Sequence, residues 1–190
     1  RANTNISLAG AVERVQEGIA AFKAEAQAGV RMRGYISCVT ECPYDGPVEP
    51  SEVARLAELL HGAGCDEISL GDTIGMAYPE QVARMLEAVV QRVPAGLLAG
   101  HFHDTAGRAL ANIDTSLDYG LRIFDASIAG LGGCPYAPGA KGNVDTQLVY
   151  DHLVARGYEI AGSPDRAGLE RAARLARKIL GRTEGAEDAI

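Results

Sequence analysis

The stretch Leu97–Thr105, LLAGHFHDT, changes from apolar to polar side chains within a few residues. Its first half is typical of a buried strand, and a helical pattern begins near Ala106. Successive side chains of a strand point to opposite faces of a sheet, so His101 and His103 should share one face. Two imidazoles at the end of a strand make half of a metal site. The alternative is a pair of hydrogen-bonded structural histidines, because an HxH pattern alone is weak evidence.

Alternating apolar and helical segments surround this stretch on both sides. Strands are predicted to begin near residues 32, 67, 97 and 122, with helical patterns between them. Their spacing of about 30 residues matches a (β/α)₈ barrel, in which ~250 residues make eight units. The chain therefore holds about half of such a barrel, and a small doubly wound α/β domain is the alternative. A four-stranded half leaves two sheet edges unpaired. We therefore expect a fragment whose first strands lie upstream of Arg1, or a half that pairs with another copy.

Composition excludes two classes of partner. The net charge of −7 and the pI near 5.1 argue against nucleic-acid binding, which needs a basic surface. No apolar run approaches the roughly 20 residues that cross a membrane. We expect one domain over residues 1–190, with a frayed tail at about 182–190. The four cysteines form no CxxC pair, which argues against a zinc knuckle. No secretion signal is visible, so free thiols are expected rather than disulfides.

Polar residues follow the predicted strands, where both barrels and open α/β sheets place their sites. This clustering favours an enzyme over a scaffold. Asp72, in GDTIG, could bind substrate, orient a histidine or carry a proton, and the alternative is a turn or cap residue. Asn143 could offer a hard oxygen ligand or could cap the following helix. Cys134, in the glycine-rich segment GLGGCPY, could move a proton on a closing loop or could be unreactive.

Several motifs together resemble 3-hydroxy-3-methylglutaryl-CoA lyase (HMG-CoA lyase). The segment Ser127–Tyr136, SIAGLGGCPY, matches that family's signature nearly letter for letter, with Ile128 where valine is usual. GYISC at 34–38 with CPY at 42–44, EISLGDTIG at 67–75 and HxHDT at 101–105 are also similar to that family. The resemblance extends from about residue 1 to about residue 180.

The resemblance implies a TIM barrel, of which this chain would be roughly the C-terminal half (strands 5–8) with its C-terminal helices. It implies a divalent metal, Mg²⁺ or Mn²⁺, held by His101, His103 and Asn143. It also implies catalytic roles for Cys134, His101 and Asp72. The family's remaining metal-binding aspartate, its neighbouring arginine and a catalytic glutamate have no counterpart here, which puts the activity of this chain alone in question.

The activity implied is retro-Claisen cleavage of 3-hydroxy-3-methylglutaryl-CoA to acetyl-CoA and acetoacetate, in leucine degradation and ketone-body formation. An acyl-CoA substrate and a homodimer are expected. The location would be cytoplasmic for a bacterial chain, or the mitochondrial matrix for a eukaryotic one. One alternative is a related barrel that runs the Claisen condensation, such as isopropylmalate or homocitrate synthase, although these lack the GGCPY loop. The other is a non-catalytic half-barrel.

Overall fold

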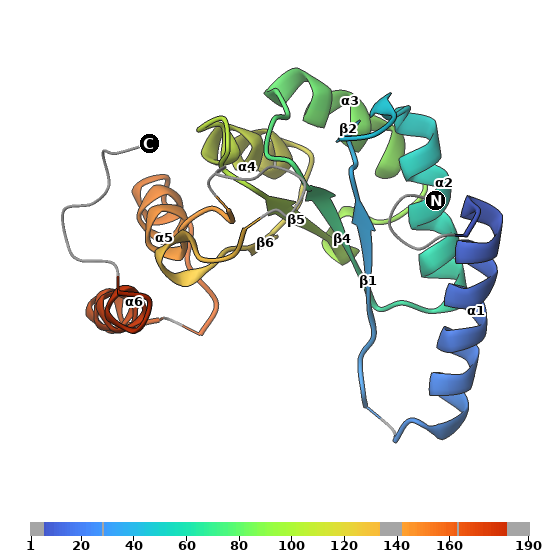
Figure 1. The fold of residues 1–190 in the computed structure, drawn as a ribbon, viewed down its shortest axis with the longest axis horizontal. Coiled ribbons are helices and arrows are strands. Elements are labelled where there is room, and N and C mark those ends of the chain that lie inside the picture. Colours follow the sequence, from blue (N-terminus) through green and yellow to red (C-terminus); the bar gives the residue numbers. More distant parts are fainter. Residues whose placement is uncertain (1–5, 28, 134–141, 163, 182–190) are drawn as a thin grey trace.

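The computed structural model describes residues 6–27, 29–133, 142–162 and 164–181 (Figure 1). The α-helices are α1 (Leu8–Glu25), α2 (Pro50–Ala63), α3 (Pro79–Val89), α4 (Ala109–Asp118), α5 (Thr146–Ala155) and α6 (Arg166–Ile179). The strands are β1 (Arg33–Ser37), β2 (Glu41–Cys42), β3 (Gly46–Pro47), β4 (Glu67–Asp72), β5 (Leu98–Phe102) and β6 (Ile123–Asp125). Short 3₁₀ turns cover Ala95–Leu97 and Ile128–Gly130.

The main sheet contains β1, β4, β5 and β6, in that spatial order and with every neighbouring pair parallel. The predicted α/β architecture with a parallel sheet is therefore confirmed. A doubly wound sheet reverses its strand order at a switch point. The described strands instead follow one another in chain order, as in a barrel, so the doubly wound alternative is wrong for this sheet. Strands β2 and β3 form a small antiparallel hairpin between β1 and α2 in the chain.

One face of the sheet is apolar and packs against helices, and Figure 1 shows α2, α3 and α4 along this side. In β4, the side chains of Ile68 and Leu70 alternate with Ser69 and are almost completely buried in the core. Burying each such aliphatic side chain contributes about 1.5–3 kcal/mol. Gly34 of β1 leaves the room that α2 needs, because a Cβ there would lie 3.0 Å from Leu60 Cδ1. The opposite face of the sheet is polar.

The sheet is curved, as the contacts of Asp125 on this polar face show. The register aligns Ser69 with Ala99 and Ala99 with Ile123, yet the Ser69 hydroxyl donates to Asp125, two residues beyond Ile123. From β4 to β6, two strands away, the contact is thus displaced by two residues, or about one residue per strand. A barrel of eight strands with a shear of eight has the same displacement per strand. The polar face is therefore the concave one, equivalent to the interior of a barrel.

Helix boundaries follow local capping chemistry. In α2, Pro50 occupies the first turn and Glu49 is the N-cap. A proline fits there because its missing N–H would have no intrahelical partner. Asp145 caps α5 and Asp165 caps α6, each through a side-chain carboxylate. Among the described residues, no helix is both long and apolar enough to span a bilayer.

Candidate active site

His101 and His103 lie at the carboxyl end of β5, on the concave face. Their ring centroids are 5.5 Å apart, with a tilt of 46° between the planes. His103 is buried, and His101 is partly exposed. Burial, and then the nearby His101, lower the pKa of His103. The neutral imidazole, the form that binds metals, is therefore favoured at this position.

Asn143 lies beside His103, although 40 positions separate them in sequence. The two residues form an antiparallel β-bridge. The flanking backbone completes this contact, because Asp104 N–H donates to the Gly142 carbonyl at 2.9 Å and Val144 N–H to the Phe102 carbonyl at 3.2 Å. Directly opposed residues of an antiparallel pair place their side chains on the same face. The structure thus brings Asn143 to the histidine pair.

The amide of Asn143 is not a helix cap. Its Nδ2 donates to the Leu131 carbonyl at 3.0 Å, and Asp145 caps α5 by accepting from Gln147 N–H at 2.6 Å. Gly132 allows this approach, because a Cβ there would lie 2.6 Å from the Asn143 Nδ2. The glycine at 132, with φ at +102°, therefore serves close packing around Asn143.

Asp125, at the end of β6, joins the histidines to the rest of the concave face. Its Oδ2 lies 3.1 Å from His101 Nδ1 and accepts from the Ser69 hydroxyl at 3.0 Å, while its Oδ1 accepts from Arg33 Nη1 at 2.7 Å. Burial alone would raise the pKa of Asp125. The hydrogen bonds from His101, Arg33 and Ser69 outweigh burial and lower that pKa to about 2.

Arg33 is also paired with a second acid. Its Nε lies 2.5 Å from Glu67 Oε1, an ion pair in which the Nε–H itself is not aimed well enough for a hydrogen bond. The guanidinium thus lies between Glu67 and Asp125, and its single positive charge, only partly exposed, is shared by the two carboxylates.

The side-chain donor atoms of His101, His103 and Asn143 suit a divalent cation. The buried Nδ1 of His103 has no hydrogen-bond partner in the described part of the chain. Asp125 occupies Nδ1 of His101, which leaves Nε2 of that ring for a ligand, and a carboxylate behind a histidine is common in metal sites. Two imidazole nitrogens and an amide oxygen fit Mg²⁺, Mn²⁺ or another borderline divalent ion. Among the described residues, no cluster of three His, Cys, Asp or Glu side chains suited to a metal occurs.

Asp72 lies on the other face of the sheet. It aligns with Phe102 of β5, a core residue, whereas the preceding Gly71 aligns with His101. The Asp72 carboxylate is buried and accepts from Gly75 N–H at 3.2 Å and Ala77 N–H at 3.0 Å. Burial raises the pKa of Asp72, against the effect of these backbone donors. The contacts are those of a turn residue, and a catalytic role for Asp72 stays a prediction.

Comparisons with known proteins place these features in a family. The HMGL-like family model matches residues 1–175. The chain belongs to the HMGL-like family. The resemblance inferred from the sequence motifs is thereby confirmed.

HMGL-like proteins of known activity are similar over most of this chain. The 3-hydroxy-3-isohexenylglutaryl-CoA/hydroxy-methylglutaryl-CoA lyase of Pseudomonas aeruginosa is 47% identical, covering 98% of this chain and 61% of the relative. A crystal structure of the HMG-CoA lyase from Brucella melitensis is 52% identical, with a TM-score of 0.88 over 94% of this chain and 61% of that one. An Acinetobacter baumannii HMG-CoA lyase, solved with coenzyme A and 3-methylmalate, is 31% identical with a TM-score of 0.85, covering 99% of this chain and 61% of that one. Related lyases carry names that place them in mitochondria or in the cytoplasm.

The matched length corrects one expectation. The chain spans about three-fifths of the relatives compared above, 61% in each, rather than half. The comparisons do not support the prediction that it is the C-terminal half of an HMGL-like barrel with strands 5–8. The repeat spacing gave only the number of strands present, and a count of strands does not fix their position in a closed, repeating sheet.

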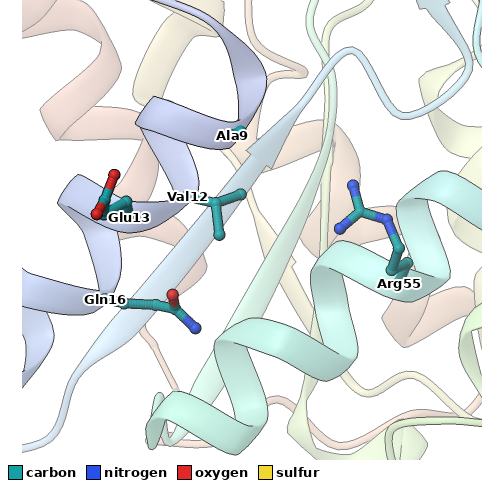
Figure 2. A pocket seen from close by; sticks show the side chains of 5 residues that line it. All are labelled: Ala9, Val12, Glu13, Gln16 and Arg55. Atoms are coloured by element: carbon teal, nitrogen blue, oxygen red, sulfur yellow. The ribbon is translucent and has the colours of Figure 1, made fainter.

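Two expectations for this HMGL-like chain fall outside the described residues: the placement of Cys134 and the frayed tail at 182–190. Cys38, Cys42 and Cys65, the cysteines that the structure describes, are not in disulfides, as expected. A surface hollow of about 520 Å³ lies between α1 and α2, and Figure 2 shows the side chains that line it. It is lined by Ala9, Val12, Glu13, Gln16 and Arg55, and it shares no residue with the histidine site.

Sequence reasoning missed Arg33, Ser69 and Asp125. Asp125 ends β6, so the rule that selected His101 and Asp72, polar side chains at strand ends, could have found it. Arg33 and Ser69 lie toward the starts of their strands and carry no such signal. Only the stagger of a curved sheet brings them to Asp125.

Proposed function

We propose that this chain carries the reaction site of a carbon–carbon lyase that cleaves 3-hydroxy-3-methylglutaryl-CoA to acetyl-CoA and acetoacetate. The observation that carries the proposal is the convergence of His101, His103 and Asn143 on the concave face of a chain 47–52% identical to named lyases of this activity. Coenzyme A with 3-methylmalate in a related lyase supports an acyl-CoA substrate. We further propose that the four-stranded arc is part of a closed barrel.

His101, His103 and Asn143 would hold a divalent metal, Mg²⁺ or Mn²⁺. A bound metal would make the substrate's tertiary hydroxyl more acidic and fix its orientation. The chain's own side chains would do the rest. A base on the concave face takes the hydroxyl proton. Asp72 lies on the helix side, and His101 can take this role only while its Nε2 is not bound to the metal, because its Nδ1 faces Asp125. The carbon–carbon bond then breaks, and its electron pair moves onto the thioester as an enolate of acetyl-CoA.

Cys134 is proposed as the acid that protonates this enolate carbon, which gives acetyl-CoA and prevents recondensation. Its sequence position supports the proposal, because it follows Gly133 in the segment that packs on Asn143 through Leu131 and Gly132. A thiol near a cation loses and regains a proton more easily than an isolated one. Water exclusion by the same segment would protect the enolate.

The test is product release by the purified 190-residue chain. Acetoacetate and acetyl-CoA should appear with Mg²⁺ or Mn²⁺, and the His103→Ala and Asn143→Ala variants should lose at least ~10²-fold in turnover. His61→Ala is the matched control, because His61 lies exposed on α2 and should leave turnover unchanged. The chain covers only 61% of its relatives, so the negative outcome is decided with the full-length protein. If that protein is folded and metal-loaded and releases no product, the activity is rejected and a non-catalytic half-barrel is favoured.

A second experiment tests which acyl-CoA substrates the protein accepts. The Pseudomonas aeruginosa relative is named for an isohexenyl substrate as well as the methyl one, so both acyl-CoA compounds should be compared. Incubation of acetyl-CoA with 2-oxoacids tests the condensing alternative, which predicts product from these instead. We also propose a homodimer, to be measured by light scattering, and a location in the cytoplasm or the mitochondrial matrix, as the names of related lyases suggest.

A further inference from the structure

Asp125 contacts three side chains from three other strands. Arg33 comes from β1, Ser69 from β4 and His101 from β5. An aspartate at this place has no counterpart among the residues expected to bind metal or move protons. Through its contact with Nδ1, Asp125 can act on His101.

The arrangement of donors leaves one assignment for the His101 proton. Arg33 Nη1 donates to Oδ1, and the Ser69 hydroxyl donates to Oδ2, so Asp125 lies in an ion pair as a carboxylate. A carboxylate can only accept hydrogen bonds. The 3.1 Å contact between His101 Nδ1 and Oδ2 is therefore a bond only if Nδ1 carries the hydrogen. In that tautomer, Nε2 carries a lone pair.

We propose that Asp125 is a positioning residue that fixes His101 as the Nδ1–H tautomer and orients the ring, so that its Nε2 lone pair is offered to a bound cation. Arg33 and Ser69 hold the carboxylate in place for this task. The proposal rests on the proposed function only for its effect on activity, because the tautomer is a property of the chain itself.

Asp125→Asn gives a sharp prediction. An asparagine keeps one oxygen and replaces the other by an NH₂ donor. The NH₂ group cannot face the Arg33 guanidinium, which only donates, so it takes the place of Oδ2 and faces His101 Nδ1. His101 Nδ1 must then accept, and the hydrogen moves to Nε2. A single substitution should thus invert the tautomer and block the nitrogen offered to the cation.

The experiment reads the tautomer directly by long-range ¹H–¹⁵N correlation NMR of the ¹⁵N-labelled, metal-free 190-residue chain. The chain has four histidines, so the His101 signals are assigned from a His101→Gln variant. Wild-type His101 should show a protonated Nδ1 and a bare Nε2, and Asp125→Asn should show the reverse. Ser69→Ala should keep the wild-type pattern, because both carboxylate oxygens remain.

A second readout is the affinity for Mn²⁺, measured by electron paramagnetic resonance. Asp125→Asn should weaken it by about 10–100-fold, as loss of the partner behind a histidine ligand does in other sites. Asp114→Asn is the matched control, because Asp114 pairs with His152 Nε2 at 2.7 Å between α4 and α5 and should leave Mn²⁺ affinity unchanged.

The outcomes separate this proposal from the lyase assignment. A wild-type His101 with its hydrogen on Nε2, or an unchanged tautomer in folded Asp125→Asn, overturns the positioning role even if the chain is active. If Asp125→Asn does not fold, the wild-type spectrum alone still decides the tautomer. A confirmed tautomer, together with a folded and metal-loaded full-length protein that cleaves no substrate, overturns the lyase proposal and leaves the positioning role intact.

Discussion

The guanidinium of Arg33 and the carboxylate of Asp125 meet at 2.7 Å, although they lie on the two opposite edge strands of the sheet. A flat sheet would separate the backbones of these strands by roughly 14 Å, three spacings of about 4.8 Å. The ion pair therefore spans the concave face from one edge strand to the other. It ties β1 to β6, two strands that are not neighbours in the described sheet.

Replacing Arg33 should destabilise the fold. Arg33→Met keeps the aliphatic stem but leaves Glu67 and Asp125 partly buried without their cation, so the free energy of unfolding should fall by about 1–3 kcal/mol. Urea unfolding measures this change. Arg92→Met is the control, because its pair with Glu58 is more exposed and should contribute no more than about 1 kcal/mol. Equal losses of unfolding free energy in the two variants would show that the Arg33–Asp125 ion pair has no special structural role.

The same pair sets a pH dependence of stability. In the folded chain, the pKa of Asp125 is lowered from the usual value of a free aspartate to about 2. A carboxylate with a lowered folded pKa stabilises the fold above its unfolded pKa, and loses that contribution as pH falls through the folded pKa. The difference in stability between wild type and Arg33→Met should therefore be constant near neutral pH and shrink between about pH 4 and pH 2. Unfolding curves of both proteins across this window give the answer, and a difference that grows with acid would contradict the assignment.

Gly75 should be required for the position of His103. Its φ is +67°, and a Cβ there would lie 2.9 Å from the backbone carbon of His103 and 2.6 Å from the Thr105 hydroxyl oxygen. Gly75→Ala should cost about 1–2 kcal/mol for the left-handed backbone alone and should also weaken Mn²⁺ binding by displacing His103. Gly96→Ala is the matched control, because nothing lies within 4 Å of its added Cβ. A Gly75→Ala chain with wild-type Mn²⁺ affinity would show that His103 is held by other contacts.

Cys134→Ala tests the proposed acid. Turnover should fall by ~10² or more while metal content stays near normal, because proton transfer is lost and ligation is not. Cys42→Ala, in the small hairpin, should change neither quantity. Wild-type turnover in Cys134→Ala would refute the acid role.

The sequence predicted the features that depend on local pattern. The apolar run before His101, the shared face of the two histidines and the parallel strand order follow from side-chain alternation and repeat length. Asn143 was predicted as ligand or cap, and the backbone bridge to His103 with Asp145 at the cap removes the second alternative. Such a bridge joins distant segments, so no local pattern could choose between the two.

The other differences between expectation and structure come from geometry that sequence does not encode locally. Asp72 was selected as a strand-end residue, but it lies one position past Gly71, which aligns with His101, and a shift of one residue moves a side chain to the other face. Asp125 was overlooked because its importance lies in its partners. Those partners reach it only through the curvature and stagger of the sheet, which result from all four strands packing together.

The ion pair between Arg33 and Asp125 also affects the kinetics of unfolding. Its residues are 92 positions apart, and β4 and β5 must pair before the two edges can approach. Contacts with such long loops tend to form after the folding barrier, where they slow unfolding and leave the folding rate almost unchanged. The ion pair would thus lengthen the lifetime of the native state by slowing its unfolding.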